Sequence, residues 1–137
     1  MKAAATFSIR DFKPADMSPV PSVVTALPVG VSTMEKRYSG EIEGRSATVF
    51  TAAFDQVSGI GCYLAMESFE GIVNGQEGAF NFVHSASTSG NDRANEFFCI
   101  VDGSGTGNLK GISGTGGIKV APDGTHHIWF DYHMAAS

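Results

Sequence analysis

The chain has 137 residues, of which 42% are hydrophobic and 17% charged, so it carries enough apolar surface for the core of one globular domain over residues 1–137. The formal net charge is −5, and the nine Lys and Arg residues are scattered along the chain. This pattern excludes the clustered basic surface that a nucleic-acid-binding groove requires, so we expect no nucleic-acid partner.

The N-terminal segment lacks the features of an export signal, because Ser8, Arg10 and Asp11 interrupt its apolar residues. No stretch approaches the ~20 apolar residues that a membrane-spanning helix needs. Cys62 and Cys99 lie in apolar runs, where an unpaired cysteine behaves as a small hydrophobe. We therefore predict a cytoplasmic protein with two free thiols and no membrane partner, with a Cys62–Cys99 disulfide as the alternative.

The first predicted strand covers residues 4–12, where Phe7 and Ile9 share one face. Regularity stops at residues 13–31, which hold four of the five prolines. Proline cannot donate a backbone hydrogen bond, so we predict a long Pro-rich connection here instead of a central strand or a helix. Connections of this length are often functional. A lid over the mouth of a barrel and a packed or mobile linker both stay open.

Two further strands are predicted at residues 31–44 and 45–55, before a turn at Ser58-Gly59. Alternation in the second run places four residues on one face: Thr48, Phe50, Ala52 and Phe54.

Residues 63–86 form the longest strand pattern of the chain, two runs that meet at Asn74-Gly75. Asn-Gly is the strongest short-range signal for a hairpin, because a type I′ turn needs positive φ at both central residues. With these as the two loop residues, Val73 lies opposite Gln76, and the rest of the register follows by counting back.

This register places Glu67 opposite Phe82 and Ala65 opposite His84. Glu67 and His84 then become diagonal neighbours on an aromatic face, within reach of each other. That face combines seven residues: Tyr63, Ala65, Glu67, Phe69, Phe80, Phe82 and His84.

The C-terminal part begins with a polar stretch at residues 85–95, which we predict to be a turn, and a strand at 95–102. Residues 103–117 are rich in glycine but lack the flanking helix and the lysine spacing of a phosphate-binding loop. We predict a strand with bulges and tight bends there. A last strand at residues 125–134 has a single apolar face, made of Ile128, Phe130, Tyr132 and Met134.

About eight strands joined mostly by turns predict an all-β protein, an eight-stranded antiparallel β-barrel whose closure removes exposed edges. A β-sandwich is the alternative.

Four segments carry a resemblance to a known family: MESFEG at 66–71, EGAFNFVHS at 77–85, GSGTGNLKGISGTG at 103–116 and FDY at 130–132. In this order they resemble a bacterial family of unknown function that is similar in fold to allene oxide cyclase and dirigent proteins, which form eight-stranded antiparallel barrels. The resemblance covers about residues 32–135. It implies a lumen that holds a hydrophobic small molecule, and it assigns no catalytic residue.

We therefore expect a barrel that binds a hydrophobic small molecule, with cyclase or isomerase activity as the enzymatic form of that function. The alternative is a non-enzymatic structural or protein-interaction barrel. A homodimer is compatible with both, and no cofactor is expected.

The candidate site centres on Glu67 and His84, because a carboxyl and an imidazole can act as a general acid–base pair. The alternative is a structural hydrogen bond in the core. The ligand-binding candidates are Tyr63, Phe69, Phe80, Phe82 and Tyr132.

No metal site is expected. His127 and His133 share a strand face with Asp131, but residues six apart on a strand are ~20 Å apart, too far for one ion.

Overall fold

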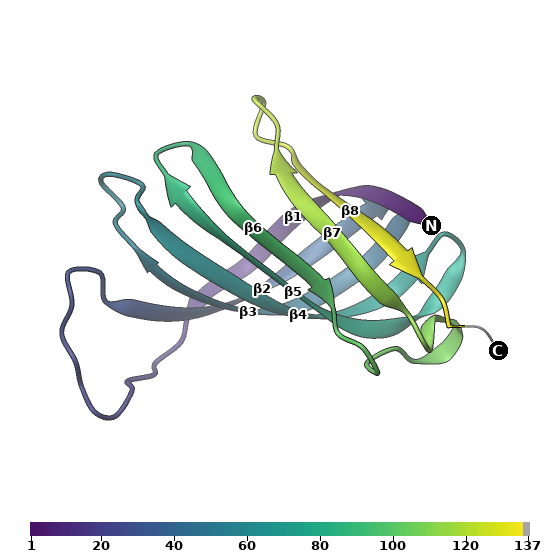
Figure 1. Ribbon diagram of the computed structural model, residues 1–137, viewed down its shortest axis with the longest axis horizontal. Coiled ribbons are helices and arrows are strands. Elements are labelled where there is room, and N and C mark those ends of the chain that lie inside the picture. The colour runs from purple at the N-terminus through teal and green to yellow at the C-terminus, as the bar shows by residue number, and fades with distance from the viewer. Residues whose placement is uncertain (136–137) are drawn as a thin grey trace.

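The computed structural model describes residues 1–135 and shows a closed, eight-stranded antiparallel β-barrel (Figure 1). The final strand pairs with the first, for example Ile128 with Ala5, which confirms the barrel and excludes the sandwich. The strands are β1 (Lys2–Pro14), β2 (Val29–Gly40), β3 (Ile42–Phe54), β4 (Gly61–Val73), β5 (Gln76–Ser89), β6 (Asp92–Ile100), β7 (Ser113–Val120) and β8 (His126–His133), with one 3-10 helix, η1 (Gly107–Leu109).

Strict alternation of buried and exposed side chains determines which face of each strand lines the barrel. In β4, Ala65, Glu67 and Phe69 are buried, whereas Leu64 and Met66, which alternate with them, are exposed. A strand with one apolar face can bury it only toward the lumen of a closed sheet. The same pattern in β8 buries its predicted apolar face: Ile128, Phe130 and Tyr132.

The β4–β5 hairpin has the predicted turn and register. Asn74 has φ 47° and Gly75 has φ 81°, as a type I′ turn requires. Glu67 pairs with Phe82, and Ala65 with His84. Glu67 and His84 therefore share the inner face, and both are almost completely buried.

Three segments differ from the prediction. The Pro-rich connection is shorter, residues 15–28, because β1 and β2 extend into the expected range. Residues 85–95 are mostly strand: β5 continues to Ser89, and only Gly90 and Asn91 turn, because backbone pairing with β6 accommodates these small polar residues. The glycine-rich segment contains η1 before β7 begins, and this short helix buries Leu109 completely.

The Pro-rich segment projects beyond the body of the barrel (Figure 1). Its residues are exposed except for the half-buried Leu27, and Val20 retains 95% of its accessible surface. In this arrangement it does not cover the barrel as a lid would.

The lumen is filled at one end and open at the other. Aromatic rings pack together at the filled end. The ring centroid of Phe82 lies 5.1 Å from that of Phe98 and 5.5 Å from that of Phe130. Ile42 and Val73 close that end and have no exposed surface. The mouth lies at the opposite end, beside the turns that join β3 to β4, β5 to β6 and β7 to β8.

The most sparsely paired seam among the described strands lies between β6 and β7, where Ile100 pairs with Gly114 and no other backbone pair forms. At Ile118, side chains of β6 take the place of the missing backbone hydrogen bonds. The carbonyl oxygen of Ile118 accepts a hydrogen bond from Arg93 Nη1 at 3.3 Å, and its backbone N–H donates one to Glu96 Oε2 at 3.4 Å. Arg93 and Glu96 are thereby held beside the lumen.

Both cysteines are free thiols, so the disulfide alternative is not realised. Cys62 is exposed, contrary to the expectation of an apolar environment, because its position in β4 points outward. Within residues 1–135, the structure contains no helix that is both long and apolar enough to cross a membrane.

A row of glycines lets three strands bend. Gly44 pairs with Gly71, and Gly71 with Gly78. Gly71 has φ 156°, and a Cβ there would lie 2.0 Å from the carbonyl oxygen of Glu43.

Replacing Gly71 by Ala should lower the free energy of unfolding by about 1–3 kcal/mol or more, through backbone strain and this overlap. Gly30→Ala is the control, since nothing lies within 4 Å of its Cβ position. Equal midpoints in urea denaturation for the two variants would contradict this account.

Candidate functional site

A buried carboxylate, that of Glu67, organises the polar layer across the lumen. Its Oε2 accepts a hydrogen bond from Lys36 Nζ at 2.8 Å. Its Oε1 accepts from Tyr38 Oη at 2.5 Å and from Ser46 Oγ at 2.7 Å. Thr48 lies directly opposite Glu67 in the register and completes the layer. Inward-facing positions of β2 and β3 thus supply the donors to one carboxylate of β4.

The layer contains one charge of each sign, and both are sequestered from water: the side-chain exposure is 7% for Lys36 and 0% for Glu67. Burial, together with the Glu67 charge, raises the pKa of Tyr38 well above its usual value, so its phenol remains a hydrogen-bond donor. Lys36 also lies 5.0 Å from the ring centroid of Phe7, a cation–π contact. Both carboxylate oxygens of Glu67 accept hydrogen bonds from protein donors, one of them the charged Lys36, which supports its role as an internal counterion.

His84 pairs with Glu96 and not with Glu67: its Nε2 lies 2.9 Å from Glu96 Oε2. The alternative considered above, a hydrogen bond between Glu67 and His84, does not form in the described part of the chain. Glu67 accepts its hydrogen bonds from donors of β2 and β3 instead, and Glu96 of β6 binds His84. Burial lowers the pKa of His84 although Glu96 opposes this effect. A neutral imidazole that donates from Nε2 to a carboxylate keeps Nδ1 as a free base.

A cavity of about 220 Å³ lies between the polar layer and the mouth. His84 and Lys36 reach it from the polar side, and Ala65 leaves space in its wall. The remaining lining residues are Phe7, Ile9, Phe12, Met34, Phe50, Tyr63, Arg93, Ile118 and His126.

Tyr63 carries the one unsatisfied group of this region. Its ring stacks on Phe50 at 5.3 Å and lies 5.5 Å from His84. The guanidinium of Arg93 lies 5.4 Å from the same ring. Its hydroxyl is buried and, among the described residues, makes no hydrogen bond of normal geometry, although the guanidinium of Arg93 lies close enough to act on its pKa. Leaving such a group unpaired costs about 1–3 kcal/mol, which a bound ligand could recover.

Of the ligand residues predicted from the sequence, Tyr63 lines the cavity and the other four do not. Tyr63 lines the cavity with His84. Phe69, Phe80 and Phe82 belong to the packed core and do not line it. Tyr132 lies beside the β4–β5 turn, where its hydroxyl accepts a hydrogen bond from Asn74 Nδ2 at 2.8 Å.

Four polar residues of the site were missed by the sequence analysis: Lys36, Arg93, Glu96 and His126. Two of them had a usable signal, because Lys36 alternates with the inward residues Met34 and Tyr38, and Glu96 precedes Phe98 by two positions. Arg93 and His126 reach the cavity at strand ends near the mouth, where alternation is least informative.

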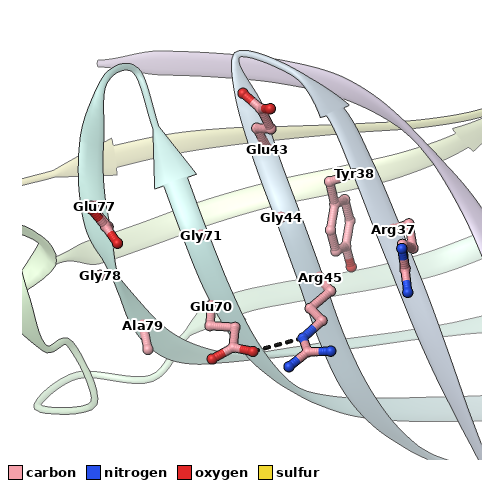
Figure 2. A pocket seen from close by; sticks show the side chains of 10 residues that line it. All are labelled: Arg37, Tyr38, Glu43, Gly44, Arg45, Glu70, Gly71, Glu77, Gly78 and Ala79. Carbon is pink, nitrogen blue, oxygen red and sulfur yellow. Dashed lines mark hydrogen bonds and ion pairs between the residues drawn. The ribbon is translucent and has the colours of Figure 1, made fainter.

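An outer groove of about 700 Å³ lies on the opposite side of the sheet, at the bend of β3, β4 and β5 (Figure 2). Gly44, Gly71 and Gly78 form its floor, and Arg45 donates to Glu70 at 2.7 Å across it. This ion pair is well exposed and contributes little, so the groove offers no built site. Among the described residues, no three His, Cys, Asp or Glu side chains are placed to hold a metal ion.

Comparison with known proteins identifies relatives of unknown function. A family described as "Protein of unknown function (DUF3224)" matches residues 3–132. A crystal structure of a protein of unknown function from the DUF3224 family of Shewanella oneidensis MR-1 is similar, with 25% identity and a TM-score of 0.85 over 100% of this chain and 98% of that one. No curated protein matches. The expected family of unknown function is confirmed, and the likeness to allene oxide cyclase and dirigent proteins stays a prediction.

Glu67→Gln tests whether Glu67 is the counterion of Lys36. The amide keeps an acceptor for Tyr38 and Ser46, but it leaves the Lys36 charge buried without a partner. We expect a loss of about 3–5 kcal/mol in the free energy of unfolding. The double variant Lys36→Met/Glu67→Gln removes the stranded charge and should recover most of this loss in a double-mutant cycle by urea denaturation. Unchanged stability in Glu67→Gln would favour a catalytic or ligand-anchoring role instead.

Proposed function

This chain belongs to the DUF3224 family of proteins of unknown function, and we propose that it binds a small, mainly apolar molecule in the lumen of its barrel. The carrying observation is the cavity beside His84, which contains a buried Tyr63 hydroxyl without a partner. Ligand sites are typically apolar hollows with a few convergent polar groups, and this cavity has that composition.

The size of the cavity limits the ligand. At about 220 Å³ it is smaller than the ~300–1,000 Å³ pockets that hold drug-sized compounds. Phe7, Phe12 and Phe50 provide flat apolar walls for it. A fragment-sized aromatic or short aliphatic compound fits this space and these walls.

A purely structural or protein-interaction barrel is supported less well. Small barrels commonly fill the interior with side chains, as the closed half of this one does. The half near the mouth instead keeps Ala65 at a central inward position, where a larger apolar residue would fill the space.

Isomerase or cyclase activity is the second candidate, and the His84–Glu96 pair favours it. Glu96 orients the imidazole, and the free Nδ1 could take a proton from a carbon beside a ligand carbonyl, leaving an imidazolium and an enolate. Lys36 and Arg93 also line the cavity and could stabilise the enolate oxygen. Return of the proton to another carbon would complete an isomerisation.

Filling the cavity tests binding. Fragment-sized apolar compounds such as indole and hydrocinnamate should raise the melting temperature of the wild-type chain by mass action. Ala65→Leu places a larger side chain in the cavity and should abolish this shift, while Ala47→Leu, on the exposed outer face, should preserve it. The proposal fails if no compound stabilises the wild type, or if Ala65→Leu responds as the wild type does.

Proton transfer is tested by deuterium incorporation into benzylacetone in heavy water, followed by NMR. His84→Gln keeps a donor for Glu96 but has no basic nitrogen, so incorporation should fall to the uncatalysed rate. Because the pKa of His84 lies below its ordinary value of 6.5, the wild-type rate should hold as pH falls through 6.5 and decline only under more acidic conditions. Equal rates in variant and wild type would rule out His84 as the base.

A further inference from the structure

The cavity is lined by cations although the protein as a whole is acidic. The formal net charge of the chain is −5, yet every charged side chain among the described lining residues is basic: Lys36 and Arg93. His84, His126 and Tyr63 supply the other polar groups, and no carboxylate or amide side chain joins them. The local charge is therefore opposite in sign to that of the whole molecule.

The carboxylates of this region lie behind the lining residues. Glu67 binds Lys36 from the polar layer, and Glu96 binds His84 from the β6–β7 seam. Neither carboxylate lines the cavity. They compensate the cost of burying the site, while the cavity surface itself presents mainly hydrogen-bond donors.

These donors have spare capacity. Arg93 donates to the carbonyl of Ile118 at 3.3 Å through Nη1, one of its five N–H groups. Lys36 Nζ makes one hydrogen bond, to Glu67, although it has three protons. The buried hydroxyl of Tyr63 makes no hydrogen bond of normal geometry within residues 1–135, and burial raises the pKa of Tyr63 although Arg93 opposes this effect, so it remains a donor.

His126 lies near the mouth, where two positive charges act on its imidazole. Its ring lies 5.0 Å from that of Phe7 on the cavity wall. Burial lowers the pKa of His126, and the charges of Lys36 and Arg93 lower it further. Both cations therefore act on one point of the cavity, and a bound anion there would relieve the repulsion between them.

We infer that the ligand of this cavity is an apolar molecule that carries a carboxylate group, held by Arg93, Lys36 and the hydroxyl of Tyr63. The inference rests on the proposed binding function and adds the chemical class of the ligand. A guanidinium and a phenol are suited to carboxylate oxygens, because hydrogen bonds to ionised acceptors are about twice as strong as neutral ones. The aromatic walls hold the apolar part.

A matched ligand series separates this inference from the proposed function. Isothermal titration of the full chain with hydrocinnamate, hydrocinnamamide and phenylpropylamine varies the polar group on one apolar skeleton. The affinity for the acid should be at least about tenfold higher than that for the amide, and the amine should bind most weakly. Equal binding of acid and amide overturns the carboxylate assignment and keeps the binding function. Failure of all three to bind overturns both.

Two variants assign the preference to residues. Tyr63→Phe removes only the unpaired hydroxyl, so it should lower the acid-to-amide affinity ratio while the melting temperature stays equal or rises. Arg93→Gln keeps a donor for Ile118 but loses the charge, and it should reduce the same ratio about tenfold. Arg37→Gln, on the exposed outer face, is the matched control. An unchanged ratio in both cavity variants overturns the assignment, and amide binding reports whether each variant retains the site.

Discussion

A carboxylate that water cannot reach must find its hydrogen-bond donors within the protein, and in this barrel Glu67 imposes that requirement on three strands. Lys36 and Tyr38 of β2 and Ser46 of β3 meet it together. Each donor reaches Glu67 only if β2, β3 and β4 keep their register, because a shift by one residue would turn it outward. The hydrogen bonds of the polar layer, in the middle of the lumen, therefore form only when these three strands pair in the correct register.

The same layer divides the interior into two halves with different properties. On one side, rings such as Phe82 and Phe98 pack against each other as part of the hydrophobic core. On the other side, the cavity begins where Lys36 and His84 present their polar ends. Glu67 supplies the counterion of Lys36 from within this layer, so Lys36 can line the cavity without the full cost of an unpaired buried charge.

The β6–β7 seam contributes the other half of the site. Where regular pairing stops, Arg93 and Glu96 bind the backbone of Ile118 and take over part of the missing ladder. The same two side chains also contact residues of the lumen, since Glu96 orients His84 and Arg93 covers the ring of Tyr63. The proposed ligand site and the closure of the barrel therefore share these two side chains, so a ligand that engages Arg93 would also stabilise the seam.

Local features could be predicted from the sequence alone: most of the strands, the Asn74-Gly75 hairpin with its register, and the inward face that carries Glu67 and His84. These follow from a period of two and from the φ angles that a tight turn demands, both of which are local properties. The sequence did not predict which groups meet across the lumen. Lys36 and Glu67 are 31 positions apart in the chain, and alternation with Phe98 could place Glu96 on the inner face but could not pair it with His84 beside the β-bulge of β5 and β6. Contacts across a lumen depend on how the whole sheet tilts and closes, so the division between core and cavity, and the partner of each buried charge, came from the fold.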